Sequence, residues 1–389
     1  MRRRVSLCLA VLLSACAAPP HDGGAPSPAV KALFVDGLVL LEGSIGGERG
    51  WWILDSGYEY SLLDSAGARR AGLVVSTSEA VAAPGGTVSQ GWARSVRVAL
   101  DRGEFSTDSV AVMDLSGLAP VTGQVLAGLL GHDFFVRYVV TIDYATRAVR
   151  LAEPATYLPP TGAVAVPVWI EAAEPFAPAT LYVGGRTVPA KLKLDTGSLS
   201  GLGLNGSFVA QNRLIPDAWP RRAVEGTAVG GATRNLITRI DSMAFGGVVI
   251  PQPVTGWSED LTRVGDAGTL GAPILARFTV TFDYAHRRLL LEPQSGASAR
   301  QAWDASGMLL VQPPGGDVLV AQVLPDTPAG DVGIAAGDVL VSIDRRPTRD
   351  AGLDSLRRYF RHPGRRDTLV LVRSGRTTTA VLTERPVLP

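Results

Sequence analysis

The stretch WILDSG at residues 52–57 has a near copy, KLKLDTG, at residues 191–197. In each copy a Leu precedes an Asp that is followed by Ser or Thr and then by Gly. Two further pairs of motifs follow in the same order: LLG at 129–131 and TLG at 269–271, then VVTIDY at 139–144 and TVTFDY at 279–284. Every pair is separated by 140 residues, as Asp55 and Asp195 are. A common separation over three motifs indicates an internal duplication, so the two halves should share one fold.

Each half has the pattern of a β unit with tight turns. An apolar strand, a Gly-Gly turn and a second strand lead into the Asp triplet. The unit ends with the strand around Asp143 or Asp283, a basic turn and a last apolar strand. Gly-rich stretches at 83–87 and 226–231 suit the tips of hairpins that cover a cleft. Frequent Gly, Pro, Val and Thr, with few long amphipathic patterns, predict a mainly β protein.

The doubled pattern resembles the pepsin and retropepsin-like aspartic proteases, here as two retropepsin-like halves in one chain. The motif that carries the resemblance is Asp-Ser/Thr-Gly after apolar residues, followed beyond a hairpin-rich interval by an apolar pair and Gly. It covers residues 31–293, divided into a first half at 31–160 and a second half at 161–293. The resemblance implies two β-barrel halves that form a pepsin-like bilobal unit with aspartic-type endopeptidase activity on extended polypeptides.

The resemblance makes Asp55 and Asp195 the catalytic pair, one from each half. Two carboxyl groups held against each other cannot both ionise easily, so they titrate in two steps. The ionised member then acts as a base on a water molecule, and the protonated member acts as an acid. Asp143 and Asp283 also repeat, but each stands at a strand end before a turn, so we interpret them as turn-forming residues.

The resemblance also assigns supporting roles around the dyad. Gly57 and Gly197 would let the backbone pass close behind each carboxylate. Ser56 and Thr196 would form hydrogen bonds across the axis between the halves. The two loops would be buttressed from below by the ends of apolar strands, at Leu130, Gly131, Leu270 and Gly271.

Residues 303–386 resemble the PDZ domains of exported bacterial proteases. A strand at 318–323 precedes the sequence PDTPA and then GIAAGDVLVSID at 333–344, which predicts a short helix, a Gly-Asp turn and a strand. A helix near 353–360 and strands near 368–373 and 377–383 complete the pattern. By position, the peptide-binding loop would contain Gly307, Met308, Leu309 and Leu310. Peptide binding and simple packing against the protease both remain open.

The first residues have the pattern of a lipoprotein export signal. Three Arg residues precede the apolar stretch 5–13, which is too short to span a bilayer, and LSAC at 13–16 resembles the bacterial lipobox. We expect residues 1–15 to be a signal peptide, Cys16 to be lipidated and residues 16–30 to be a flexible tether. The protein would then be exported and anchored to the cell envelope, on a membrane facing the periplasm, with the outer membrane favoured in a Gram-negative cell.

The composition limits the kinds of ligand and partner that the protein is expected to bind. A formal net charge of +1 makes nucleic acid an unlikely ligand, and the four His residues show no zinc-ligand spacing, so we expect no metal and no cofactor. Cys8 lies within the signal peptide, which leaves the mature chain without an internal disulfide. The expected partners are polypeptide substrates, peptide ligands of the PDZ domain and the membrane. Because both half-sites occur in one chain, we expect a monomer, with residues 294–302 as a polar linker.

One departure from the family pattern keeps a second hypothesis open. Tyr58 follows the first triplet, where these families usually carry a small residue, whereas Ser198 follows the second. A Tyr at this place could crowd the first carboxylate or donate a hydrogen bond to it. In the alternative, the double-β unit is a non-catalytic scaffold, and the lipid-anchored protein binds peptides through the PDZ groove.

Overall fold

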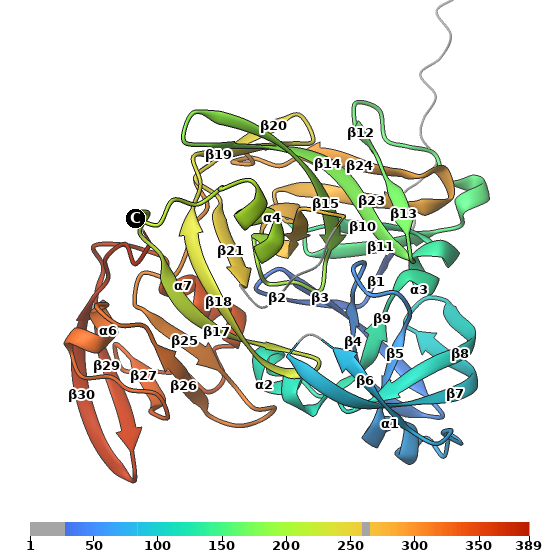
Figure 1. The fold of residues 1–389 in the computed structure, drawn as a ribbon. Helices are drawn as coiled ribbons and strands as arrows, with labels where there is room; N and C mark the ends of the chain where they lie inside the picture. Colours follow the sequence, from blue (N-terminus) through green and yellow to red (C-terminus); the bar gives the residue numbers. More distant parts are fainter. Residues whose placement is uncertain (1–27, 84, 259–264, 389) are drawn as a thin grey trace, which may run out of the picture.

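The computed structural model describes residues 28–83, 85–258 and 265–388. Within these residues the strands form four sheets, and the fold is mainly β, as predicted. Figure 1 shows the two duplicated halves stacked one above the other, with the C-terminal sheet beside them at the lower left. The predicted signal peptide and Cys16 lie outside the described residues.

The first half is an eight-stranded sheet in the order β2-β3-β4-β9-β5-β8-β7-β6. Its strands are β2 (Ala32–Val35), β3 (Leu38–Ile45), β4 (Glu48–Leu54), β5 (Leu62–Asp64), β6 (Glu79–Ala83), β7 (Gly86–Leu100), β8 (Glu104–Met113) and β9 (Leu126–Leu130). Its helices are α1 (Ser65–Arg70), η1 (Ser116–Leu118), α2 (Ala119–Thr122) and α3 (His132–Arg137). Strand β9 lies between β4 and β5, parallel to β4 and antiparallel to β5. The β4–β5 loop therefore crosses the end of β9.

The second half repeats this arrangement. Its main path runs β17-β18-β21-β16-β22-β15-β14-β19-β20, and β13 pairs with β14. The strands are β13 (Trp169–Glu171), β14 (Glu174–Val183), β15 (Arg186–Asp195), β16 (Leu202–Asn205), β17 (Arg222–Ala228), β18 (Gly231–Arg239), β19 (Ser242–Phe245), β20 (Val248–Pro251), β21 (Val254–Ser258) and β22 (Gly268–Gly271). The helices are α4 (Gly206–Gln211) and α5 (Ala272–Leu275). Strand β22 lies between β15 and β16, parallel to β15, as β9 does in the first half.

A six-stranded sheet joins the two halves. Its order is β1-β11-β10-β23-β24-β12. The strands are β1 (Ala29–Val30), β10 (Val139–Asp143), β11 (Ala148–Ala152), β12 (Val164–Pro167), β23 (Phe278–Asp283) and β24 (Arg288–Pro293), with η2 (Pro154–Thr156) and η3 (Tyr284–His286) beside them. Thr141 pairs with Thr281 in the register of β10 and β23, and their hydroxyl oxygens lie 2.9 Å apart. Equivalent residues of the repeat thus meet on a pseudo-twofold axis.

The duplicated halves share one apolar core. Buried residues from both halves and from the joining sheet form a single cluster, which includes Val140 and Ile142 of β10 and Val280 and Phe282 of β23. Because these side chains alternate along their strands, the sheet packs apolar residues against both halves. The predicted Gly-Gly turns connect β3 with β4 and β14 with β15, and positive φ at both glycines of each turn allows the tight reversal.

The chain enters the fold slightly earlier than predicted. Ala29 and Val30 were expected to belong to the tether, but they pair with Arg150 and Val149 of β11. Val30 is buried in the shared core, and this burial explains why the strand forms before residue 31. Residues 16–27 of the predicted tether lie outside the described residues.

The C-terminal unit has its own sheet and core. The sheet order is β25-β26-β27-β29-β30, with β28 beside β27. The elements are β25 (Met308–Val311), β26 (Val318–Val323), α6 (Pro328–Asp331), β27 (Val339–Ile343), β28 (Arg346–Pro347), α7 (Leu353–Tyr359), β29 (Arg366–Arg373) and β30 (Arg376–Thr383). Leu353 and Leu356 of α7 are buried in a separate apolar cluster, together with Leu340 and Leu369 of the sheet. The predicted strand, short helix, strand and final helix and hairpin are confirmed.

The C-terminal unit is held against the duplicated halves by charged groups. The carboxylate of Asp36, in the β2–β3 turn, forms an ion pair with Arg361, and its backbone N–H donates to Asp354 at 3.0 Å. Arg147 reaches Asp354 from the joining sheet at 2.9 Å. The segment predicted as a linker also packs on the second half, since Gln301 is buried and accepts a hydrogen bond from the Val254 N–H. No helix among the described residues is long and apolar enough to cross a membrane.

Candidate functional site

The two Asp triplets occupy equivalent loops of the two halves. Asp55 follows β4 and Asp195 ends β15, so each stands where a strand leaves the sheet beside the inserted strand β9 or β22. The Asp55 N–H donates to the Leu130 carbonyl at 3.0 Å, which ties the first loop to the end of β9. The topology thus places both carboxylates at the junction of the two halves.

The two carboxyl groups face each other across the pseudo-twofold axis, close enough for the charge of Asp195 to raise the pKa of Asp55. Each one accepts the N–H of the Gly in its own triplet at 3.0 Å. Each also packs against the Gly of the opposite triplet: a Cβ on Gly57 would lie 2.4 Å from Cγ of Asp195, and a Cβ on Gly197 would lie 2.4 Å from Cγ of Asp55. Any side chain at either glycine would separate the pair. The predicted close approach of the backbone is present.

Ser56 and Thr196 lock the two loops together. The Ser56 N–H donates to the Thr196 hydroxyl at 2.9 Å, and the Thr196 N–H donates to the Ser56 hydroxyl at 3.1 Å. Each hydroxyl then donates across the axis, Ser56 to the Leu194 carbonyl at 2.9 Å and Thr196 to the Leu54 carbonyl at 2.6 Å. Both residues are fully buried, so an unmade bond here would leave a desolvated polar group at a cost of about 1–3 kcal/mol.

The strand ends below the triplets are packed too tightly for larger residues. Leu130 and Leu270 are fully buried. A Cβ on Gly131 would lie 2.4 Å from the Tyr60 carbonyl oxygen, and one on Gly271 would lie 1.9 Å from the Ser200 carbonyl oxygen. These glycines allow β9 and β22 to pass directly beneath the loops that carry the carboxylates, in agreement with the predicted buttress.

Burial and mutual repulsion make the pair retain a proton. Asp55 is 9% exposed, and the Asp195 side chain is 16% exposed. Burial, followed by the charge of Asp195, raises the pKa of Asp55 from 3.8 to about 8, although the ammonium of Lys193 and the Gly57 N–H oppose the shift. At neutral pH Asp55 therefore keeps its proton. An arrangement of this kind can act as a base and as an acid on the same water and carbonyl group.

Two hairpins, one from each half, meet at their tips. The first is β6–β7 and the second is β17–β18. Their tips touch, because a Cβ on Gly85 would lie 2.6 Å from the Gly231 carbonyl oxygen and one on Gly86 would lie 2.9 Å from that of Gly230. Val81 and Val88 of the first hairpin and Val229 of the second pack on one apolar cluster. Both predicted hairpins are thus present, and they pack on the apolar cluster that contains Tyr58, the residue after the first triplet.

Tyr58 does not point its hydroxyl at either carboxylate. The hydroxyl lies 4.0 Å from Sδ of Met113, and the ring stacks edge-on against Tyr60 with the centroids 5.5 Å apart. Tyr60 in turn contacts Trp92 of β7. Burial, with the nearby charges of Tyr60 and Asp55, raises the pKa of Tyr58 well above its usual value, so the side chain stays neutral. Tyr58 belongs to an aromatic wall beside the pair and leaves both carboxylates free.

Three residues near the pair were not predicted. Lys193 Nζ lies 3.7 Å from the Asp195 carboxylate and 3.1 Å from Glu174. Tyr284 is buried with its hydroxyl 3.5 Å from the Ser56 carbonyl, and burial, with the charges of Asp55 and Asp195, raises its pKa far above its usual value. The sequence could have identified Lys193 because it stands two residues before Asp195 on one strand, so both side chains lie on the same face. Tyr284 could have been identified from its place in the third repeated motif.

The loop predicted to bind peptides in the C-terminal unit is already satisfied by this chain. The N–H groups of Ser306 and Gly307 donate to the carboxylate of Asp304, and the Met308 N–H donates to the Ser306 hydroxyl. Met308 and Leu310 are buried in the core of the unit, with Leu309 half-buried between them. Arg357 of α7 donates to the Leu310 carbonyl at 2.8 Å. A peptide carboxylate would have to displace Asp304 to reach these N–H groups.

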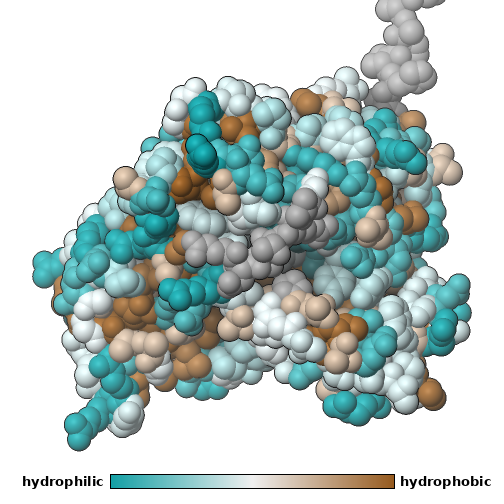
Figure 2. Space-filling view, in the orientation of Figure 1, coloured by the Kyte–Doolittle hydropathy of each residue, from teal (hydrophilic) through white to brown (hydrophobic). Residues whose placement is uncertain are grey.

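The outer end of β25 contacts the first half instead. The Gln312 N–H donates to the Pro120 carbonyl of α2 at 2.8 Å. Strand β25 pairs with β26 on one side, and α7 and α2 contact it as well. Figure 2 shows this face of the molecule, with hydrophobic residues gathered at the left over the C-terminal sheet.

The second hairpin is fastened to the C-terminal unit. Arg222 of β17 donates to the Pro325 carbonyl at 2.7 Å and to the Val387 carbonyl at 2.9 Å, and the Glu225 N–H donates to the Gln322 side chain at 3.0 Å. Leu388 packs with Ile237 of β18 in a small apolar cluster. Figure 1 shows β17 and β18 running beside this unit and down toward β6.

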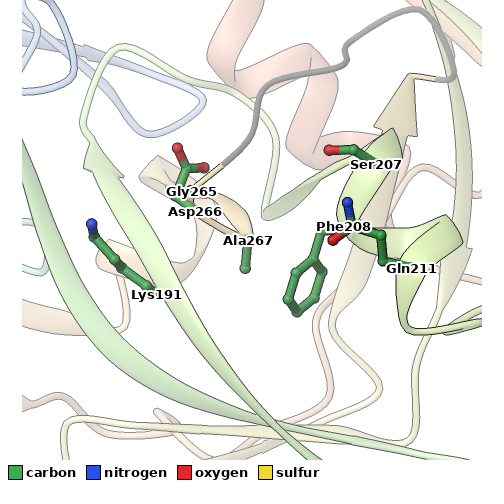
Figure 3. Close-up of a pocket in the computed structure, with 7 residues that line it drawn as sticks. All are labelled: Lys191, Ser207, Phe208, Gln211, Gly265, Asp266 and Ala267. Atoms are coloured by element: carbon green, nitrogen blue, oxygen red, sulfur yellow. The ribbon is translucent and has the colours of Figure 1, made fainter.

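A separate pocket of about 240 Å³ lies in the second half and contains neither Asp55 nor Asp195. Figure 3 shows Lys191 on one side and Phe208 and Gln211 of α4 on the other. Lys191 is paired with Glu171 at 2.5 Å. Gly265, Asp266 and Ala267 complete its lining, and we assign the pocket no function.

Comparison with known families identifies two of the units. Residues 41–134 match the family described as Aspartyl protease, and residues 319–374 match the PDZ domain family. No curated protein matches the chain. The chain therefore contains an aspartyl protease domain, which includes the first triplet and its hairpin, and a C-terminal PDZ domain.

The raised pKa of Asp55 predicts that D55N stabilises the protein at high pH. A carboxyl group whose pKa rises from 3.8 unfolded to about 8 folded favours folding below pH 4, and this contribution is lost as the pH rises to 8. We expect D55N to melt several degrees above the unsubstituted protein at pH 8–9 and at the same temperature near pH 4. Thermal unfolding followed by circular dichroism between pH 4 and 9 measures this. The exposed Asp108→Asn variant should show no such trend, and a parallel pH dependence for D55N would contradict the retained proton.

Proposed function

We propose that this protein is an aspartic endopeptidase of the bacterial cell envelope, with Asp55 and Asp195 as its catalytic residues. The observation that supports this most directly is the meeting of the two carboxyl groups, from equivalent loops of the two halves, in a largely buried site. The hydrogen bonds between Ser56 and Thr196 fix the separation of the two carboxyl groups. A scaffold that binds peptides passively has no chemical need for such a pair.

The geometry supports a general acid–base mechanism. The ionised carboxylate takes a proton from a water molecule, whose oxygen forms a bond to the peptide carbonyl carbon. The electron pair of the C=O π bond moves to the carbonyl oxygen, which receives the proton of the other carboxyl group. In the second step the C–N bond breaks as the nitrogen is protonated by the first carboxyl group, and a hydroxyl proton of the intermediate returns to the second. The dyad ends in its starting state, without metal or cofactor.

The closed hairpins suit an extended polypeptide substrate. Both hairpins offer backbone groups at their tips, and glycines there allow close approach of another chain. Because the tips touch, we expect at least one hairpin to lift when a polypeptide enters. Closure over the bound chain would then exclude bulk water from the dyad.

We propose that the PDZ domain orients the second hairpin. It holds both strands of that hairpin through Arg222, Glu225 and Ile237. Its predicted peptide-binding N–H groups are filled by Asp304 and Ser306. This arrangement favours a PDZ domain that packs on the protease and controls access to the cleft over the alternative of a scaffold acting through an open groove.

We also propose that Cys16 carries a lipid anchor, as the lipobox-like sequence LSAC suggests. The first described strand, β1, begins at Ala29, so the segment between Cys16 and the fold spans at least a dozen residues. A tether of that length would allow the protease to reach polypeptides near the membrane surface.

The first test of the proposed activity is peptide cleavage. The chain from residue 17 onward should cut a mixed peptide library between pH 4 and 8, whereas D55N and D195N should each lose at least about a hundredfold in kcat/KM, because neither carboxyl group works alone. Mass spectrometry of the products measures the cuts.

Asp143→Asn is the matched control for these substitutions, because Asp143 also repeats in the second half but only caps a turn. Its cleavage rate should stay within a few-fold of the unsubstituted protein. An inactive parent, or cleavage that survives in both D55N and D195N, would favour the scaffold.

The second test concerns the anchored hairpin. Removing the side-chain contacts in R222A or Q322A should raise amide hydrogen exchange in residues 222–239 several-fold, most directly at Glu225, whose N–H bonds Gln322. Hydrogen exchange with peptide-level mass spectrometry reads this out. Arg234→Ala removes an exposed Arg from the same hairpin and should leave the exchange unchanged; equal exchange in all variants would show that the PDZ domain does not hold the hairpin.

The third test concerns the anchor. Expression of the full chain in a bacterium supplied with labelled palmitate should label the protein and place it in the membrane fraction, and Cys16→Ser should abolish both results. Cys8→Ser serves as the control because Cys8 lies in the predicted signal peptide. Retention of the label in the Cys16→Ser variant would exclude this anchor.

A further inference from the structure

Lys193 breaks the twofold symmetry of the dyad. It stands two residues before Asp195 on β15, so the two side chains leave the strand on the same face. The equivalent position in the first half is Ile53, which is buried in an apolar cluster beside the other loop. One carboxyl group therefore has a cation beside it, and its partner has none in the equivalent place.

The ammonium group of Lys193 is held by three oxygen atoms. Nζ lies 3.1 Å from the Glu174 carboxylate and 3.7 Å from the Asp195 carboxylate, and it donates to the Gly57 carbonyl at 3.2 Å. The Lys193 side chain is 17% exposed and that of Glu174 is 5% exposed. Because Gly57 belongs to the first triplet, Lys193 crosses from the second half to the first. A largely buried cation with this set of partners is fixed in place.

Among the residues that the structure describes, the titratable side chains that contact the two triplets and the aromatic wall add no further cation beside the dyad. Tyr58 and Tyr284 stay neutral because burial and nearby negative charges raise their pKa values. His132, whose ring lies 5.6 Å from that of Tyr284, has its pKa lowered by burial and is neutral near pH 7. Glu59, beside Tyr58, is exposed, and its charge acts on Tyr58 and Tyr60. Within the described ranges, the charged side chains paired beside the dyad are thus Lys193 and Glu174.

Lys193 keeps its own charge in this setting. Burial disfavours the ammonium group, but the carboxylates of Asp195, Glu174 and Asp55 outweigh burial and raise the pKa of Lys193 above its usual value. Its charge also opposes the rise in the pKa of Asp55. Both effects are those of a cation that stabilises negative charge on the dyad. Lys193 Nζ lies within ion-pair distance of the Asp195 carboxylate, so its charge acts mainly on Asp195.

We propose that Lys193 is a positioning residue that assigns the proton of the dyad, holding the negative charge on Asp195 and leaving the proton on Asp55, with Glu174 fixing the ammonium group. The inference rests on the proposed aspartic protease function. It makes Asp195 the base that draws the proton from water and Asp55 the acid that protonates the carbonyl oxygen. It also ties the pH range of the enzyme to an ion pair outside the two Asp triplets.

The test compares the pH profiles of kcat/KM for the unsubstituted chain, K193M, K193R and E174Q. Losing the cation in K193M should move both limbs of the profile to higher pH by about one unit, because a carboxyl group deprived of a nearby cation binds its proton more tightly. K193R keeps the charge and should restore the original profile. E174Q removes the opposing anion and should move the limbs to lower pH.

Lys191→Met provides a matched control. Lys191 lies on the same strand and forms a similar pair with Glu171, but it is two residues farther from the dyad. Its removal should leave both limbs in place. A purely structural role for Lys193 predicts lower kcat in K193M and E174Q without opposite shifts, and that result would overturn the inference.

A titration that needs no turnover separates this inference from the proposed function. In protein labelled with ¹³C at the Asp carboxyl groups, nuclear magnetic resonance should place the Asp55 midpoint near 8 and should find it at higher pH in K193M. If K193M alone does not fold, the double variant K193M/E174Q, which removes both charges, takes its place in the titration. Its Asp55 midpoint should also lie at higher pH than that of the unsubstituted protein. A shifted Asp55 midpoint in a protein that cleaves no peptide would contradict the protease function and support the charge assignment. An unshifted midpoint in an active protease would support the function and contradict the charge assignment.

Discussion

The hydrogen bonds between the Ser56 and Thr196 loops are the contacts on which the arrangement of the site depends. Each hydroxyl accepts an N–H from the other triplet and donates to a carbonyl beyond it, so neither loop can move without breaking buried bonds in both halves. This network of hydrogen bonds keeps the two carboxyl groups in contact although their charges repel each other. Burial, followed by the charge of Asp195 in that enforced contact, raises the pKa of Asp55 to about 8.

Symmetry explains why the site forms, and asymmetry explains how it can divide two chemical tasks. The pseudo-twofold axis through Thr141 and Thr281 supplies two equivalent carboxyl groups, between which a proton would have no preferred place. Lys193 removes that equivalence, because its counterpart Ile53 is apolar. A duplicated chain can carry such a difference at a single position, since its two halves vary independently.

The sequence predicted the parts of the site that repeat. The 140-residue separation identified Asp55 and Asp195, their loops and the strand ends beneath them, because the same local structure requires the same residues in both halves. Lys193 was missed because a polar residue in a strand ordinarily marks a solvent-facing side, and only comparison with Ile53 could have shown that this face is largely buried. Glu174 has no repeat and reaches Lys193 through the pairing of β14 with β15.

Contacts between units were beyond reach of the sequence for a different reason. Arg222 and Gln322 belong to no motif, and their contacts depend on how the PDZ domain lies against the second hairpin. The same holds for Asp304, whose carboxylate fills N–H groups that the PDZ resemblance reserves for a peptide. Burial raises the pKa of Asp304 to about 7 despite those hydrogen bonds, so this carboxyl group is held at an energetic cost. The PDZ domain thus satisfies its own peptide-binding loop and at the same time holds the second hairpin, and these contacts are the basis for the proposal that it controls access to the dyad.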